Sequence, residues 1–196
     1  MLLFKELIYQ GIQAGQVPAR TKAAREWYRD TAQQSQGGLT PSSVVRKFSQ
    51  KRKVARPDAG QMYAFRYDPK GKQTLPYYDV FPLVFPIESY SDGFLGINFH
   101  YLPLALRAKL MDALYSVTSD KRYDENTRLV ATYRVLQAAS KYKAFRPTIK
   151  HYLYAHVRSP FLEITAPEWD IALFLPMESF KKATKETVWK DSRGKI

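Results

Sequence analysis

The stretch that most constrains the fold of this chain is GQMYAFRYDPKGKQTLPYYDVFPLVFPIESYSDGFLGINFHYLP, from Gly60 to Pro103. It contains three short runs rich in β-branched and aromatic residues, at 62–67, 80–87 and 94–102. Asp-Pro-Lys-Gly and Ser-Asp-Gly segments separate these runs, a pattern that is typical of strands joined by tight turns. The stretch therefore predicts a small twisted antiparallel sheet.

Helical patterns flank the predicted sheet on both sides. Apolar residues at helical spacing predict helices over about 2–13, 19–34 and 103–117, and two more within 125–158. The sheet runs alternate only partly between apolar and polar residues, so one of their faces needs a helical cover. We therefore expect an α+β fold in which several helices pack on the sheet.

Composition divides the chain into three expected parts. Residues 1–58 predict a helical and basic N-terminal arm that is extended, with a flexible joint at 33–38. Residues 59–180 predict the α+β core domain, in which 161–165 has the pattern of an edge strand. Residues 181–196 are polar and charged and predict a surface tail.

The chain is strongly basic, and its positive charge is concentrated outside the predicted sheet. Lys and Arg number 31 against 18 Asp and Glu, a formal net charge of +13. Residues 1–57 carry 11 basic and 3 acidic residues, whereas residues 58–102 carry 3 and 5. This balance favours an anionic partner such as nucleic acid, a membrane surface or an acidic protein face. The alternative is a soluble basic protein with a solvated surface.

The most basic segment is TPSSVVRKFSQKRKVARP at 40–57, which contains no acidic residue. Thr40 as N-cap and Pro41 at the first helical position predict a short helix here. One interpretation is an arm that neutralises phosphates, and the other is a solvated linker or an arm that clasps a protein partner. The candidate residues for nucleic acid or another anionic partner are Arg46, Lys47, Lys51, Arg52, Lys53 and Arg56.

Apolar and aromatic residues near the two ends of the chain are candidates for a protein interface. Aromatic and aliphatic anchors dominate the energetics of such interfaces. The candidate residues are Phe4, Leu7, Ile8, Ile12, Trp27 and Trp189.

No catalytic signature is present in the sequence. There are no cysteines, which excludes disulfides and thiolate metal sites. His151 and His156 are five residues apart and so miss the i, i+4 spacing of a helical zinc pair. Asp68, Asp79 and Asp92 could hold a metal, but Asp-Pro and Asp-Gly pairs have a simpler explanation in turn chemistry. We therefore expect no enzyme, no cofactor, no metal and no small-molecule substrate.

Aromatic residues alternate with basic residues in two regions, around 141–154 and in the predicted sheet. Flat rings beside cations could stack the bases of a single strand. Aromatic residues also dominate protein cores and interfaces, which is the alternative interpretation.

No apolar run approaches the roughly 20 residues that span a bilayer, and the first residues have no signal-peptide pattern. We expect no membrane partner, and synthesis in the cytoplasm of a cell.

Four phrases of the sequence resemble a known family. They are TLPYYDVFPLVFPIE (74–88), GFLGINFHYLP (93–103), LRAKLMDALY (106–115) and EWDIALFLPMESFKKA (168–183). Together they resemble the small basic virion proteins of T4-like contractile-tailed bacteriophages.

This resemblance implies a non-enzymatic structural component of the virion, made in the host cytoplasm. Such a component would be a tail, baseplate or neck protein that docks on other virion proteins through its termini. The alternative is a sequence-independent DNA-binding protein, such as one bound to packaged DNA ends.

Overall fold

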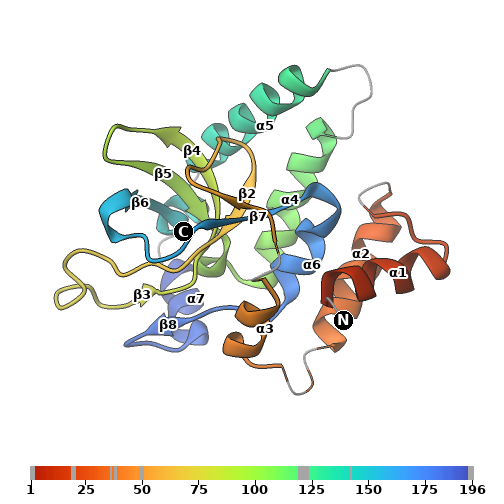
Figure 1. The fold of residues 1–196 in the computed structure, drawn as a ribbon, viewed down its shortest axis with the longest axis horizontal. Coiled ribbons are helices and arrows are strands. Elements are labelled where there is room, and N and C mark those ends of the chain that lie inside the picture. Colours follow the sequence, from red (N-terminus) through yellow and green to blue (C-terminus); the bar gives the residue numbers. More distant parts are fainter. Residues whose placement is uncertain are drawn as a thin grey trace.

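The computed structural model describes residues 3–18, 21–35, 37, 39–48, 51–118, 124–141 and 143–193 (Figure 1). The α-helices of this part are α1 (Leu3–Gln13), α2 (Lys22–Gln34), α3 (Pro41–Phe48), α4 (Leu104–Thr118), α5 (Glu125–Ser140), α6 (Trp169–Phe174) and α7 (Lys185–Arg193). The strands are β1 (Lys53–Val54), β2 (Met62–Ala64), β3 (Tyr78–Asp79), β4 (Leu83–Ser89), β5 (Gly93–Asn98), β6 (Ile149–Leu153), β7 (Phe161–Ile164) and β8 (Phe180–Lys181). The predicted α+β class is confirmed.

The strands form one six-stranded antiparallel sheet in the order β1-β7-β2-β4-β5-β6, and a two-stranded sheet of β3 and β8. The Ser-Asp-Gly segment turns between β4 and β5, which pair with Phe85 opposite Ile97. The strand predicted at 161–165 is confirmed, but its edge position is wrong because Lys53 of β1 pairs opposite Leu162. The basic segment therefore supplies the edge of the sheet.

The helix predicted at the end of the 125–158 region is wrong. Residues Lys143–Thr148 form a 3₁₀ turn, and Ile149–Leu153 then form β6, paired with β5. Pro147 lacks the amide hydrogen that a helix needs and disfavours helical backbone at the preceding residue. The apolar spacing of this segment fits a period of two as well as a period of 3.6, and pairing with β5 selected the strand.

The sheet is buried on both faces because neighbouring side chains of a strand point to opposite sides. Along β2, Met62 and Ala64 belong to the core beneath the helices, and Tyr63 belongs to a second cluster. This second cluster comprises Tyr63, Phe65, Tyr67, Val84, Phe94, Tyr152 and Phe161. A backbone bridge between Tyr67 and Val157 brings the segment after β6 back to the end of β2 and encloses the aromatic side chains.

Helices α4, α5 and α6 cover the other face of the sheet (Figure 1). Arg107 of α4 is fully buried there, and its guanidinium donates to the carbonyl oxygens of Leu102 at 2.7 Å and Leu173 at 2.8 Å. Glu178 pairs with the same guanidinium at 2.6 Å. A buried charge is tolerated only when it is paired and hydrogen-bonded in this way. No helix within the described ranges is long and apolar enough to cross a membrane.

The N-terminal helices pack on the core, so the predicted extended arm is not what the structure shows. Arg29 of α2 is 5% exposed, and it pairs with Asp170 of α6 at 2.6 Å and with Asp112 of α4 at 2.7 Å. Burial opposes ionisation of Asp112, but the hydrogen bond and charge of Arg29 hold its pKa below the usual value. Helix α2 has few large apolar residues. These ion pairs and the buried side chains of Ala24 and Ala32 hold it on the core.

Two of the predicted boundaries remain open or lie partly outside the described residues. The division between arm and core at residue 58 stays a prediction. In the joint expected at 33–38, Gln33 and Gln34 end α2 and Ser35 is its C-cap, whereas Gln36 and Gly38 lie outside the described residues.

Within the segment that the sequence predicts to be a polar tail, Lys185–Arg193 form the helix α7, which packs on the core. Val188 of α7 is fully buried, and the indole nitrogen of Trp189 donates to the carbonyl oxygen of His100 at 2.8 Å. Two apolar residues one after the other, inside a charged segment, are enough to hold a short helix on the core.

Candidate nucleic-acid interface

Five of the six predicted anion-binding residues lie at the surface of α3, β1 and the turns that follow them. Arg46, Arg52, Lys53 and Arg56 are exposed, and Lys47 is half-buried. We call these five residues the basic surface. The Arg52 side chain is 76% exposed, and its guanidinium lies 3.2 Å from the carboxylate of Glu163, whose side chain is 16% exposed. Because β1 is hydrogen-bonded to β7, the part of the basic surface around Lys53 is fixed to the sheet rather than free.

Lys51 has a different position and is not part of the basic surface. Its side chain is 13% exposed, forms an ion pair with Glu168 and lies 3.9 Å from the centre of the Phe4 ring. Burial lowers the pKa of Lys51, and the hydrogen bond that its ammonium donates to Glu168 only partly offsets this effect. Glu168 also closes a capping box with Thr165, so Lys51 connects the basic segment to the chain before α6.

A cavity of about 210 Å³ lies beside this ion pair. Its cationic lining faces two carboxylates that are already paired with Lys51 and Arg52. The lining residues with charge are Lys5, Lys47, Lys51, Arg52, Glu163 and Glu168. The cations outnumber the carboxylates, so the cavity favours an anionic group such as a phosphate.

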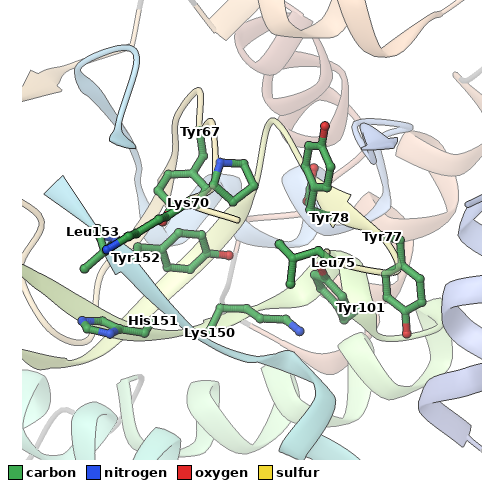
Figure 2. A pocket seen from close by; sticks show the side chains of 12 residues that line it. Tyr67, Lys70, Leu75, Tyr77, Tyr78, Tyr101, Lys150, His151, Tyr152 and Leu153 are labelled. Atoms are coloured by element: carbon green, nitrogen blue, oxygen red, sulfur yellow. The ribbon is translucent and has the colours of Figure 1, made fainter. Parts of the chain in front are cut away.

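A second cavity, of about 260 Å³, is lined by five tyrosines and two lysines (Figure 2). We call it the tyrosine pocket. It lies between the chain that joins β2 to β3, the 3₁₀ turn Phe99–Tyr101, and β6. The residues that define it are Tyr67, Tyr77, Tyr78, Tyr101, Tyr152, Lys70 and Lys150.

Strand β6 contributes Lys150, His151, Tyr152 and Leu153 to the lining of the tyrosine pocket. Figure 2 shows Lys150 and Tyr152 directed into the pocket and His151 directed the other way. The Lys150 ammonium lies 4.0 Å from the centre of the Tyr101 ring, within the range of a cation–π interaction. Tyr101 is 4% exposed, and this burial raises its pKa, so the phenol is neutral at physiological pH.

A buried polar network supports the pocket from below. Asp79 accepts from the backbone N–H of Phe81 at 3.0 Å and from Asn98 Nδ2 at 3.1 Å, and lies 2.6 Å from His100 Nδ1. Asn98 Nδ2 also donates to the Tyr152 hydroxyl at 3.1 Å. The carboxylate of Asp79 is therefore fully occupied by its neighbours, and the Tyr152 ring is held in one orientation.

One lysine holds the rim of the pocket in place. The Lys182 ammonium donates to the carbonyl oxygens of Lys72, Gln73 and Leu75 at 2.7, 2.9 and 3.0 Å. Lys182 has a φ of 70°, a conformation that is uncommon for a residue with a side chain. These bonds attach the loop before Tyr77 to β8, on the other side of the small sheet.

The predicted protein-interface residues separate into internal and accessible positions. Phe4 and Leu7 belong to the core of the chain, with 2% and 3% of their surface exposed. Ile8 and Trp27 are half-buried against that core, and Ile12 is 53% exposed. Trp189 is half-buried on the chain itself. The role of these residues in docking stays a prediction.

The three carboxylates considered for a metal are separated in the structure. Asp68 pairs with Lys72 at 2.8 Å, and the Asp79 carboxylate is occupied in the network below the tyrosine pocket. Asp92 lies in the exposed turn between β4 and β5. In the part of the chain that the structure describes, no group of three His, Cys, Asp or Glu side chains could hold a metal ion.

The tyrosine pocket is the feature that sequence reasoning missed. Its residues come from three separate segments, 67–79, 101 and 150–153, and the sequence predicts a helix for the last of them. The signal in the sequence is the repetition of tyrosine beside lysine, which is compatible with base stacking. This pattern does not indicate which tyrosine rings lie next to one another in the fold.

Comparison with known proteins identifies the family of the chain. A family described as phage T4 terminal DNA protecting protein matches residues 4–192. No curated protein and no solved structure matches the chain. The resemblance to proteins of T4-like phages is thus confirmed. The family description concerns DNA ends, gives no support to a tail or baseplate position, and favours the DNA-binding alternative. The chain belongs to the family of phage T4 terminal DNA protecting proteins.

Proposed function

We propose that this protein binds the ends of linear duplex DNA without sequence preference and shields them. The observation that carries the proposal is the basic surface, in a chain of net charge +13 whose family is described by the protection of terminal DNA. Phosphate contacts supply most of the affinity of sequence-independent binding, and they require accessible positive charge rather than a particular base.

The attachment of the basic surface to the sheet matters for affinity. A disordered arm loses conformational freedom when it binds, and this loss offsets part of the contact energy. Here Lys53 is already ordered by pairing with Leu162, and the Arg56 guanidinium lies 5.2 Å from the centre of the Tyr154 ring. Lys53 and Arg56 are therefore held in place before DNA arrives.

The experiment compares linear duplex DNA with a covalently closed circle of the same sequence, at physiological salt. We expect the protein to bind the linear DNA more tightly and to slow digestion of the linear DNA by an exonuclease. We also expect that the protein does not cut the DNA when Mg²⁺ is added. Equal affinity for the circle and the linear form would contradict binding at ends. Failure to slow the exonuclease would contradict shielding.

Charge reversal tests whether the basic surface makes the contacts. The variant changes Arg46, Arg52, Lys53 and Arg56 to Glu and leaves half-buried Lys47 and internal Lys51 in place. The matched control reverses four exposed cations on other helices, namely Lys22, Lys109, Arg134 and Lys141. We expect the first variant to lose binding and the control to keep most of it. Equal losses would show that net charge alone drives association.

A second candidate function is docking on another virion protein through α1. The observation that favours it is the exposure of Tyr9 and Ile12, two large side chains of α1 that are 61% and 53% exposed although Phe4 and Leu7 of the same helix are buried in the core. Exposed apolar anchors of this kind are common at protein interfaces. Replacing Ile12 by Ser should then reduce incorporation into virions and leave DNA-end binding unchanged. Unchanged incorporation would argue against docking through this helix.

A further inference from the structure

The tyrosine pocket has paired aromatic walls. The rings of Tyr67 and Tyr152 have centroids 4.9 Å apart on one side, and those of Tyr77 and Tyr101 are 6.1 Å apart on the other. Figure 2 shows the two pairs flanking a space into which Leu75 and Lys150 also extend. The first pair meets edge to face, with ring planes at 78°, and the second pair is tilted by 39°, so the cavity offers both ring edges and ring faces to a flat ligand such as a nucleobase.

The polar groups of the pocket suit a nucleotide. The Tyr152 hydroxyl accepts a hydrogen bond from Asn98 Nδ2, so its own proton remains for an acceptor such as a base carbonyl or ring nitrogen. Exposed Lys70 and half-buried Lys150 add positive charge beside the rings. Asp79 also lines the pocket, and its carboxylate is held by the Phe81 amide, Asn98 and His100.

The pocket size restricts the ligand to a single planar group. A volume of about 260 Å³ is just below the roughly 300–1,000 Å³ typical of sites for drug-sized ligands. A short single strand does not fit into such a space, whereas one base does.

The basic surface and the pocket are connected. Strands β1 and β6 are opposite edges of the sheet, yet Arg56, just after β1, lies over the ring of Tyr154, just after β6. Tyr154 follows Leu153, which lines the pocket. A DNA strand whose phosphates contact the cations at 52–56 is therefore directed toward the tyrosine pocket.

We propose that the tyrosine pocket binds one unpaired nucleobase at the terminus of the DNA. This inference rests on the proposed function and adds the reason for end selectivity. Drawing a base out of a duplex costs stacking and pairing energy, and the cost is least for a base that is already unpaired. A terminal base reaches the pocket at little cost, whereas an internal base does not.

The experiment uses the fluorescent base 2-aminopurine as the single unpaired 3′ nucleotide of a duplex whose other end is closed by a hairpin. Stacking on tyrosine quenches this fluorophore, so we expect quenching when the protein binds. Tyr77→Leu and Lys150→Gln should each weaken binding of this duplex roughly tenfold. Tyr9→Leu, the same substitution at a tyrosine that is 61% exposed on α1, should have no effect. Circular dichroism checks that each variant is folded.

A blunt duplex and the free nucleotide separate the possible failures. The pocket variants should affect the blunt duplex less than the duplex with the unpaired base. If the wild-type protein binds no DNA end, the proposed function fails and the inference with it. If it binds ends but does not quench, or the pocket variants weaken both duplexes equally, only the pocket inference is wrong. Equal quenching of the free 2-aminopurine nucleotide would show a site for free nucleotides instead.

Discussion

The basic surface and the tyrosine pocket differ in how the chain builds them. The basic surface comes from one segment of the sequence, 46–56, and its cations are exposed or half-buried. Long charged side chains keep their charged ends in water, so this accessibility follows largely from the residue type. The pocket joins residues from three segments, and its rings are buried or half-buried. Charge acts at long range and tolerates loose placement, whereas stacking needs rings at a defined spacing. The two regions should therefore respond differently to salt and to substitution.

The largest effect is expected where the basic segment enters the core. Lys51→Met leaves Glu168 without its partner in a region that is largely shielded from water, so the free energy of unfolding should fall by about 3 kcal/mol. Affinity for DNA should change little, because the charge of Lys51 is already neutralised by Glu168. Chemical denaturation and a binding titration measure the two quantities. A loss of affinity without loss of stability would place Lys51 in the basic surface after all.

Salt should separate the two regions next. If four phosphates are neutralised by Arg46, Arg52, Lys53 and Arg56, the slope of log affinity against log salt includes about −3.6 from these residues, or roughly a hundredfold between 50 and 200 mM. The quadruple Glu variant should lose this part of the slope. The quenching of the terminal 2-aminopurine at saturation should not change with salt, because salt changes only the fraction of DNA that is bound. Titrations at several salt concentrations, each taken to saturation, measure both.

A smaller effect is expected within the pocket. Tyr152→Phe keeps the ring and removes the hydroxyl, while Asn98 Nδ2 retains its bond to Asp79. Affinity for a duplex with one unpaired base should fall about fivefold, the value of one hydrogen bond near 1 kcal/mol. The blunt duplex serves as the reference. An equal fall for both duplexes would mean that the hydroxyl acts on folding rather than on the base.

The smallest effect concerns the rim. Lys182→Met removes the bonds to the carbonyl oxygens of Lys72, Gln73 and Leu75. Amide hydrogen exchange in this loop should become about threefold faster, with no change in the strands of the large sheet. Unchanged exchange at 72–75 would show that the loop is held by its other contacts.

Local patterns in the sequence predict several elements of the fold correctly. The Ser-Asp-Gly turn defines the hairpin of β4 and β5, and the Pro41 signal marks the first residue of α3. Thr165 and Glu168 have the spacing of a capping box in the sequence, and they form one in the structure. Each of these depends on residues close together in the chain. The basic residues of the candidate site were also predicted from one segment of the sequence. Among the six predicted residues, Lys51 is the one whose side chain is largely buried.

By itself, then, the sequence determined the features that depend on local chemistry: the helical patterns, the turn residues, the excess of positive charge and the absence of thiolate chemistry. The tertiary structure alone decided that 149–153 is a strand, that Trp189 donates to His100, and that tyrosines far apart in the chain line one pocket. The physical reason is that an apolar or aromatic side chain satisfies many environments equally well. Its partner is selected only when strands pair and close-packed side chains exclude the alternatives.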